Sequence, residues 1–491
     1  MVLFVLIVVL WFSIDLRRSL EPLLDMEKQA EFAKLLLKNN VVEEDEMQDM
    51  SLEEKGVIQE MLNLGPKKRR TFVAHAKSLT IHEKVVTILP LDEDVINSFE
   101  VNCLELDMNK LYQLQLYIFF DSEISRSTGR LYTSVSQFQQ FYERAVSKYN
   151  DVPYHNMVHA CDVTHTTFRM LCEVRSSKWA TDVEHYALLL SAICHDVGHP
   201  GTTNAFCVET EHEYALRYND ASPLENMHCA TMFEICREKE LNMFAKMSGE
   251  NKKAARKVCI NVILHTDLVH HFQMVKDLDI CYEGESKTVL DEQAKSPFNF
   301  SQGYEEVIQK HNLLLLELIL HQSDISNPLK PFDVGKAWAW LVLEEFFAQG
   351  DKEKELGIPV GMLNDRNKIN RYGSQHGFIT FLVSPLILSA ANVFQTLLPL
   401  CDNMAMNLWE WHRQWTMDAH PPAADVDKRA AEVNKIEEKV KTLAKRAGDD
   451  YGSRRTRGTR VSFASARTAR SRPSYGASRS AGTRTSRSAS P

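Results

Sequence analysis

Residues 154–163 read Tyr-His-Asn-Met-Val-His-Ala-Cys-Asp-Val (YHNMVHACDV), and the fold assignment depends on the pattern that starts here. His155 and His159 stand four residues apart, a spacing that places both imidazoles on one face of a helix. A His-Asp pair follows in HDVGHPG at residues 195–201, and a lone aspartate in SDISNP at residues 323–328. Imidazoles with carboxylates suit zinc, whereas carboxylates with water suit magnesium or manganese. The series predicts a two-metal hydrolase site that clamps the attacking and leaving oxygens of a phosphoryl displacement.

Five motifs in a fixed order carry a resemblance to a known family. They read HNxxHAxDV, HDxxHPGxxNxF, LENxH, SDISNP and GSQHGFI. In this order they are similar to the class I cyclic nucleotide phosphodiesterases, within the wider group of HD-type metal hydrolases. The resemblance covers about Leu91 to about Trp415 and implies an all-α fold, a compact multi-helix catalytic domain. Helical periodicity dominates the same region, without a sustained alternating strand pattern, which agrees with that fold.

The resemblance also implies a set of metal ligands. The tightly held ion, commonly zinc in the family, would be bound by His159, His195, Asp196 and Asp324. Asp196 would also bridge to a second, looser ion, magnesium or manganese, whose other ligands are mostly waters. Three residues would hold those waters: His199, Glu225 and Thr266. A hydroxide shared between the two cations would be the nucleophile.

His155, the first histidine of HNxxH, has a different role in the family. Opening a cyclic phosphate releases the ribose 3′-oxygen, and a nearby imidazolium can supply the proton that the departing alkoxide needs. The resemblance therefore implies that His155 is the general acid, with a third metal ligand as the alternative. The expected reaction converts a 3′,5′-cyclic nucleotide into the nucleoside 5′-monophosphate, which terminates cyclic nucleotide signalling.

Recognition of the base requires flat apolar walls and one bidentate polar group. The resemblance implies six substrate-binding positions: Tyr154, Asn327, Val342, Phe346, Gln375 and Phe378. Gln375 would select a purine, but its amide can rotate to serve adenine or guanine. Asn327 matches a position that is asparagine in the cAMP-selective members of the family, so we expect cAMP to be favoured over cGMP. The alternative for Phe346 and Phe378 is that they are ordinary core aromatics.

Two residues depart from the family pattern. Gly198 stands where many relatives carry an acid, and Met227 replaces the first histidine of a common LENHH motif. Neither belongs to the expected ligand set, so activity is still expected. The alternatives are a catalytically silent phosphodiesterase-like scaffold and an HD-type nucleotidase. The complete ligand set disfavours the scaffold, and the purine-clamp motif disfavours the nucleotidase.

The composition is that of a globular protein with an uneven charge distribution. Apolar residues make up 44% of the 491 residues and charged residues 25%, so a sizeable core can form. Residues 451–491 contain ten arginines and no acidic residue, so the rest of the chain carries −9 − 10 = −19. An acidic body does not describe a nucleic-acid-binding domain, and no nucleic-acid partner is expected. The ten cysteines include no CxxC pair and lie inside apolar helical stretches, which favours reduced core cysteines of an intracellular protein over a disulfide framework.

The amino-terminal segment is strongly apolar. Residues 1–12 form an unbroken apolar run, and Arg17-Arg18 follows shortly after it. The run is shorter than the about 20 residues of a spanning helix, and it lacks the flanks of a secretory signal. A short anchor, a truncated transmembrane helix and a buried segment remain as explanations. We favour a membrane-proximal segment with the catalytic part facing the cytoplasm; otherwise the protein would be cytosolic.

The sequence predicts five parts along the chain. They are a hydrophobic membrane-proximal segment at 1–15, a helical N-terminal extension at 16–90, the catalytic domain at 91–420, a C-terminal helix at 421–447 and a disordered Arg/Ser-rich tail at 448–491. The polar insert at 281–304 is expected to be a loop within the catalytic domain. Heptad spacing in the C-terminal helix, with Arg429 interrupting the apolar seam, allows either a homodimer or packing against the domain.

Overall fold

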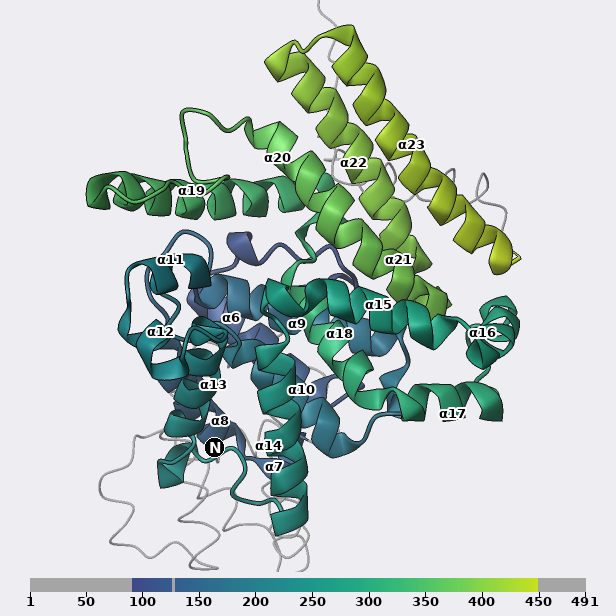
Figure 1. Ribbon diagram of the computed structural model, residues 1–491. Helices are drawn as coiled ribbons and strands as arrows, with labels where there is room; N and C mark the ends of the chain where they lie inside the picture. The colour runs from purple at the N-terminus through teal and green to yellow at the C-terminus, as the bar shows by residue number, and fades with distance from the viewer. Residues whose placement is uncertain (1–90, 126–128, 449–491) are drawn as a thin grey trace, which may run out of the picture. The chain divides into compact units, whose positions relative to one another are not determined.

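The computed structural model describes residues 91–125 and 129–448, which fall in one compact unit beginning at Thr87. Every regular element in the described residues is a helix, as the sequence predicts (Figure 1). The α-helices are α5 (Glu93–Ile96), α6 (Met108–Leu116), α7 (Gly129–Tyr132), α8 (Val135–Val146), α9 (Met157–Glu173), α10 (Asp182–Cys194), α11 (Asn204–Glu209), α12 (Glu213–Tyr218), α13 (Pro223–Ile235), α14 (Gly249–Leu264), α15 (His271–Tyr282), α16 (Glu285–Lys295), α17 (Gln302–Lys310), α18 (Asn312–Asp324), α19 (Phe332–Leu356), α20 (Arg371–Phe378), α21 (Ser384–Val393), α22 (Leu398–Ala419) and α23 (Ala423–Arg446). Short 3₁₀ helices lie at Cys103–Glu105, Ser176–Lys178, Lys239–Leu241, Leu268–His270, Asn327–Leu329 and Gln395–Leu397, and π-helical turns at Tyr117–Asp121 and Ile379–Val383. The predictions for residues 1–90 and 449–491 lie outside the described residues.

Helices α9, α10 and α18 pack against one another at the centre of this unit (Figure 1). Every residue of α9 from His159 to Leu171 is buried, and α10 is buried almost throughout. Helices that are enclosed on all sides belong in the core of a large domain, where they have little freedom to move. The ends of these three helices are therefore rigid positions for a functional site.

The start of α9 corrects one expectation from the sequence. His155 and His159 were expected on one helical face, but α9 begins at Met157 and His155 precedes it. The Asn156 side chain causes this boundary, because its Oδ1 accepts hydrogen bonds from the backbone amides of Val158 (2.9 Å) and His159 (3.3 Å). His159 consequently lies in the first turn of the helix, while His155 belongs to the loop before it.

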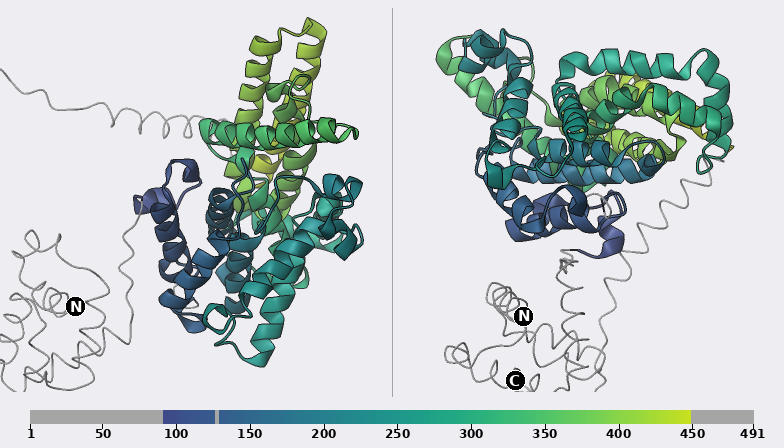
Figure 2. Two further views of the ribbon diagram at one scale, coloured as in Figure 1. Left: turned by 90° about the vertical axis from the view of Figure 1, so that its left-hand side faces the viewer. Right: turned by 90° about the horizontal axis from the view of Figure 1, so that it is seen from below.

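The carboxyl-terminal helices form a second group around α22. Helix α22 packs against α20, α21 and α23, and Figures 1 and 2 both show α22 and α23 side by side. Val433, Ile436, Val440 and Leu443 of α23 are buried. The apolar seam of the predicted heptads thus packs against the domain itself, which is one of the two arrangements that the sequence allowed.

The insert at 281–304 is the second correction, because it holds two helical segments where a loop was expected. Gly284 adopts a positive φ of 68° immediately before α16, and residues 285–295 contain neither glycine nor proline. Leu290 and Ala294 are buried on one side of α16. The glycine and proline residues therefore mark the ends of the helix, not a continuous loop.

One helical stretch among the described residues, 371–393, is long and apolar enough to cross a membrane by length and composition. Its most apolar window is 61% buried within the protein, which is how a core helix of a globular domain also behaves. All ten cysteines lie in the described residues, and none forms a disulfide there.

Candidate metal centre and active site

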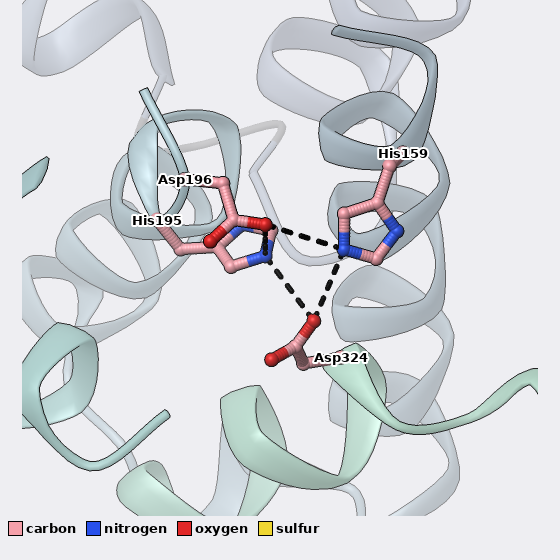
Figure 3. A group of neighbouring side chains, drawn as sticks. All are labelled: His159, His195, Asp196 and Asp324. Carbon is pink, nitrogen blue, oxygen red and sulfur yellow. Dashed lines mark hydrogen bonds and ion pairs between the residues drawn. The ribbon is translucent and has the colours of Figure 1, made fainter. Parts of the chain in front are cut away.

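Four predicted metal ligands converge where α9, α10 and α18 meet (Figure 3). His159 comes from the first turn of α9, His195 and Asp196 follow the end of α10, and Asp324 is the last residue of α18. Asp324 Oδ1 lies 3.1 Å from His159 Nε2 and 3.3 Å from His195 Nε2. Asp196 Oδ2 lies 3.5 Å and 3.2 Å from the same two nitrogens. The sequence therefore identified four residues that three separate helices bring together.

The donor atoms of this cluster fit a divalent cation. His195 Nδ1 is 2.9 Å from the carbonyl of Ala192, which can only accept, so Nδ1 donates and Nε2 is the atom that faces the carboxylates. Asp196 Oδ2 is buried without a hydrogen-bond partner among the described residues. A buried carboxylate oxygen in that state needs a compensating charge. Two imidazole nitrogens and two carboxylate oxygens are the ligands that zinc accepts, with room left for water.

Electrostatics lead to the same conclusion. Burial alone would lower the pKa of His195, but the carboxylates of Asp196 and Asp324 outweigh burial and raise the pKa of His195 well above its ordinary value. The His195 and His159 side chains in turn lower the pKa of Asp324, against the effect of its burial. The two aspartates thus create a site that attracts positive charge, and a metal ion would satisfy it.

His155 belongs to a separate group with His199 and Glu345. The His155 ring stacks on the His199 ring at 4.0 Å between centroids, and Nδ1 of His155 hydrogen-bonds to Oε1 of Glu345. Oε2 of Glu345 accepts the backbone amides of Tyr154 (2.9 Å) and His155 (3.1 Å). Burial lowers the pKa of His155, yet Glu345 and then Asp196 raise it to about 9. The ring is therefore a cation at neutral pH, and it lies beside the four-ligand cluster.

Glu345 is a site residue that the sequence analysis missed. It is buried on α19, between the predicted wall residues Val342 and Phe346. One signal was present: an acidic residue inside the apolar stretch LVLEEFF. Which of its two glutamates faces inward depends on how α19 packs, so the sequence could not distinguish Glu345 from Glu344.

Of the residues predicted to hold waters, Glu225 and His199 interact electrostatically with Asp196. Glu225 Oε2 accepts from Asn204 Nδ2 at 2.8 Å, and burial together with the nearby Asp267 raises the pKa of Glu225 to about 7. Thr266 is buried, and its hydroxyl donates to the Ile263 carbonyl at 2.8 Å.

Two buried histidines complete this side of the cluster. His199 Nδ1 accepts the backbone amide of Gly201 at 3.1 Å. His228 was not assigned from the sequence, although it is the histidine of the LENxH motif. Its Nδ1 hydrogen-bonds to the Val197 carbonyl (2.9 Å), and its Nε2 lies 3.7 Å from Asp196 Oδ1. His228 therefore contacts the side of Asp196 that faces away from the four-ligand cluster.

Five of the six predicted substrate-binding residues lie on three elements, and Tyr154 lies in the loop before α9. Asn327 begins the short 3₁₀ helix Asn327–Leu329, and its Nδ2 donates to the Tyr154 hydroxyl at 2.8 Å. Val342 and Phe346 are half-buried on α19, and Phe378 is half-buried on α20. Gln375, also on α20, is buried. The two helices pack against each other, and an ion pair between Arg371 and Glu344 joins them.

The two departures from the family pattern prove to be neighbours. Gly198 has a positive φ of 84°, and a Cβ atom at this position would lie 3.3 Å from the sulfur of Met227. Met227 is buried behind the His-Asp pair. A glycine and an apolar thioether thus lie side by side here, and neither residue is one of the four ligands.

Comparison with known proteins agrees with this geometry. The family profile described as 3′5′-cyclic nucleotide phosphodiesterase matches residues 154–404, about half of the chain. The chain belongs to the cyclic nucleotide phosphodiesterase family. The matched residues include every ligand, acid and substrate position predicted above, while α23 lies beyond them.

Curated relatives and a solved structure support the same family. The chain is 41% identical over 233 residues to the dual specificity calcium/calmodulin-dependent 3′,5′-cyclic nucleotide phosphodiesterase 1 of Drosophila melanogaster, covering 48% of this chain and 25% of the relative. It is 35% identical over 291 residues to the corresponding 1B enzyme of Cricetulus griseus, covering 59% and 49%. The chain thus spans half or less of the length of these relatives. The phosphodiesterase domain of the RhoPDE fusion protein of the choanoflagellate Salpingoeca rosetta matches with a TM-score of 0.57 and 29% identity, over 64% of this chain and 94% of that one.

Proposed function

We propose that this protein hydrolyses a 3′,5′-cyclic nucleotide to the nucleoside 5′-monophosphate and so terminates cyclic nucleotide signalling. The observation that carries the proposal is the convergence of His159, His195, Asp196 and Asp324, with the cationic His155 beside them. In this reaction an oxygen of water bonds to phosphorus and the bond from phosphorus to the ribose 3′-oxygen breaks. His155 gives its proton to that departing oxygen and regains one that the water releases.

The protein residues around His155 would hold it in the state that this step needs. Glu345 fixes the ring through Nδ1, which leaves Nε2 as the atom that can donate to the leaving oxygen. The Glu345 carboxylate also raises the pKa of His155 and so favours the protonated imidazole. We assign His155 as the acid and not as a further metal ligand, because Glu345 holds its Nδ1 and its raised pKa favours the protonated form, which does not bind a metal ion.

The cluster itself would hold zinc at the tight position, with magnesium or manganese at a second position reached through Asp196. Divalent ions held there would supply Lewis-acid charge at the phosphoryl group and a more acidic water. His199, Glu225 and Thr266 would orient the waters on the Asp196 side.

A preference for cAMP over cGMP is supported by the orientation of Asn327. Its Nδ2 is engaged by the Tyr154 hydroxyl, so its Oδ1 is the atom that remains to bind a base. Adenine presents an N6 donor where guanine presents an O6 acceptor, and an acceptor oxygen suits the donor. Gln375 would contribute the bidentate contact to either purine, between Phe378 and the opposite wall formed by Val342 and Phe346. The relatives named above are described as dual specificity, so we expect a preference and not exclusion of cGMP.

The proposal is tested by assaying the purified full chain on cAMP and cGMP side by side, with a nucleoside 5′-monophosphate as a third substrate. We expect release of 5′-monophosphate from both cyclic nucleotides and a higher kcat/KM for cAMP. Asp324→Ala should abolish this activity and lower the metal content, because it removes one ligand of four. His155→Asn should retain the metal and lose about 10²- to 10⁴-fold in kcat, the usual contribution of general acid catalysis.

Three results would contradict parts of this assignment. Full turnover and full metal content in Asp324→Ala would overturn the metal site. Loss of metal from His155→Asn would make that histidine a ligand. An inactive, metal-loaded wild-type protein would favour the silent scaffold, and activity restricted to the monophosphate would favour the nucleotidase.

A further inference from the structure

Arg429 of α23 lies where three helices meet. Its guanidinium carbon is 3.8 Å from the centre of the Trp415 ring on α22, which is a stacking distance. Its Nη1 is 3.3 Å from the place that a Cβ atom on Gly373 of α20 would occupy. Arg429 therefore fills the space between the carboxyl-terminal helix and the helix that carries Gln375 and Phe378.

The contact on α20 is tight because residue 373 is a glycine. A Cβ atom there would also lie 3.2 Å from Oδ1 of Asn370 and 3.4 Å from Cδ1 of Trp415. The distances to Asn370 Oδ1 and Arg429 Nη1 are tighter than most contacts of a Cβ atom, so a methyl group would move these neighbours by a few tenths of an ångström, whereas Trp415 is at ordinary contact distance. Gly373 allows α20 to approach Arg429 and Trp415 closely, and Gln375 follows only two residues later.

Arg429 forms no ion pair with any of the residues that the structure describes. Nη1 is buried and has no hydrogen-bond partner among the described residues. Burial lowers the pKa of Arg429, although Glu432 and then Asp425, both on its own helix, raise it. Leaving part of a guanidinium unpaired is costly, so its shape and its contact with the rings must explain the placement. The interaction holds α20 against α22 and α23 mainly by packing.

The other anchors of α23 contact different parts of the protein. Arg446 at its far end pairs with Asp291 at 3.0 Å and donates to the backbone carbonyl of Asn392 at 2.6 Å. Glu437 in its middle accepts from the Trp409 indole nitrogen at 3.1 Å. The Arg429 side chain is thus an anchor through which α23 reaches the base-recognition helix, beside a hydrogen bond between the His376 side chain of α20 and the Arg429 backbone.

We infer that Arg429 is a positioning residue for nucleotide binding: stacked on Trp415 and packed on Gly373, it fixes the place of α20 and with it the amide of Gln375. This inference rests on the proposed function, because it concerns the same substrate site. It assigns a role in base recognition to a helix outside the family profile. It also explains why an arginine interrupts the apolar seam of α23.

The test compares Arg429→Ala with Arg446→Ala, which removes an arginine anchor of the same helix away from α20. Displacing α20 should weaken binding of the purine base without altering the four-ligand cluster or His155. We therefore expect Arg429→Ala to raise KM for cAMP roughly 3- to 30-fold, with kcat and metal content nearly unchanged. Arg446→Ala should lower the Tm but leave KM near the wild-type value. Arg429→Lys should fall between wild type and alanine, because lysine keeps the charge but lacks the planar group that stacks.

A double-mutant cycle tests the contact itself. Gly373→Ala should raise KM in the wild-type background and raise it less in the Arg429→Ala background, because the crowded guanidinium is gone. Equal KM in Arg429→Ala and wild type, or equal rises in the Arg429 and Arg446 variants, would overturn the inference. If Arg429→Ala does not fold, Arg429→Lys takes its place in the cycle with Gly373→Ala. An unchanged KM in Arg429→Lys, together with additive effects of the two substitutions on KM, would then overturn the inference.

The failure of this inference can be distinguished from the failure of the proposed function. The Kd of cAMP is measured directly in the His155→Asn background, where turnover is slow, with and without Arg429→Ala. No weakening of binding there contradicts the role of Arg429, even in an active enzyme. No binding and no turnover of cAMP in the protein with both residues intact contradicts the proposed function.

Discussion

At the scale of single residues, the hydrogen bond from His155 to Glu345 favours the protonated form of the His155 imidazole. Glu345, followed by Asp196, raises the pKa of His155 to about 9 against the effect of burial. The imidazolium is the acid, so activity should be present below that pKa and decline as the pH rises through it. In the uncharged variant Glu345→Gln the pKa of His155 should fall, and the alkaline limb of the kcat profile should move to lower pH.

The measurement is kcat for cAMP from pH 6 to pH 10, with metal content as a control. Glu344→Gln is a matched substitution on the adjacent residue, whose carboxylate pairs with Arg371 and not with His155. An alkaline limb at the same pH in Glu345→Gln and wild type would show that this carboxylate does not set the protonation of His155.

At the scale of elements, a buried ion pair joins the ligand helix to the segment that carries Asn327. Nζ of Lys330 lies 2.5 Å from Oδ2 of Asp162 on α9, and both side chains are only 2% exposed. Removing one partner leaves an uncompensated buried charge, so Lys330→Met should lower the free energy of unfolding by about 3–5 kcal/mol. Lys330→Met combined with Asp162→Leu should recover much of that loss, because neither charge then remains buried.

Urea unfolding of both variants provides the measurement. Lys295→Met is the control, since the pair of Lys295 with Glu292 is largely exposed. Loss of that surface pair should change the free energy of unfolding by less than about 1 kcal/mol. A double variant no more stable than Lys330→Met would mean that packing around the lysine, and not the buried charge of Asp162, dominates.

The elements also show which features the sequence determines. The four residues of the cluster could be predicted because the order of the histidines and aspartates resembles that of the cyclic nucleotide phosphodiesterases, and the resemblance implied which of them are ligands. The start of α9 was predictable in principle, since Asn156 is a strong N-cap residue. Glu345 and Arg429 were not, because their roles depend on which face of α19 and α23 meets another helix. Helix α16 was missed because its flanking glycine and proline residues were taken for a loop.

At the scale of the whole molecule, the four-ligand cluster joins three core helices and brings two negatively charged carboxylates, those of Asp196 and Asp324, close together. Asp196 and Asp324 approach the same two imidazole nitrogens, so without a cation their repulsion is relieved only by protons. A bound metal should therefore stabilise the fold by up to about 4 kcal/mol when it is present at 1,000 times its Kd. A chelator should lower the Tm of the wild type, and readdition of zinc should restore it. Asp324→Ala should respond much less; an equal response in both proteins would place the stabilising ion elsewhere.

The predicted membrane association of the chain rests on residues outside the described part. Residues 1–12 are uniformly apolar, residues 67–70 read Lys-Lys-Arg-Arg, and the ten arginines lie within residues 451–491. Apolar insertion and attraction of basic segments to anionic lipid act together at a membrane surface. We therefore expect the full chain to sediment with anionic vesicles, with its active site accessible from the solution, and a chain beginning at Glu31 to sediment less.

The two contributions can be separated by salt, which screens charge but not apolar insertion. Raising the ionic strength should release the chain that begins at Glu31 and leave most of the full chain bound. Deleting residues 448–491 should reduce only the fraction of binding that salt removes. Equal sedimentation of the full chain and the chain beginning at Glu31 at high salt would mean that residues 1–30 do not enter the membrane, and would favour burial of the apolar run within the protein.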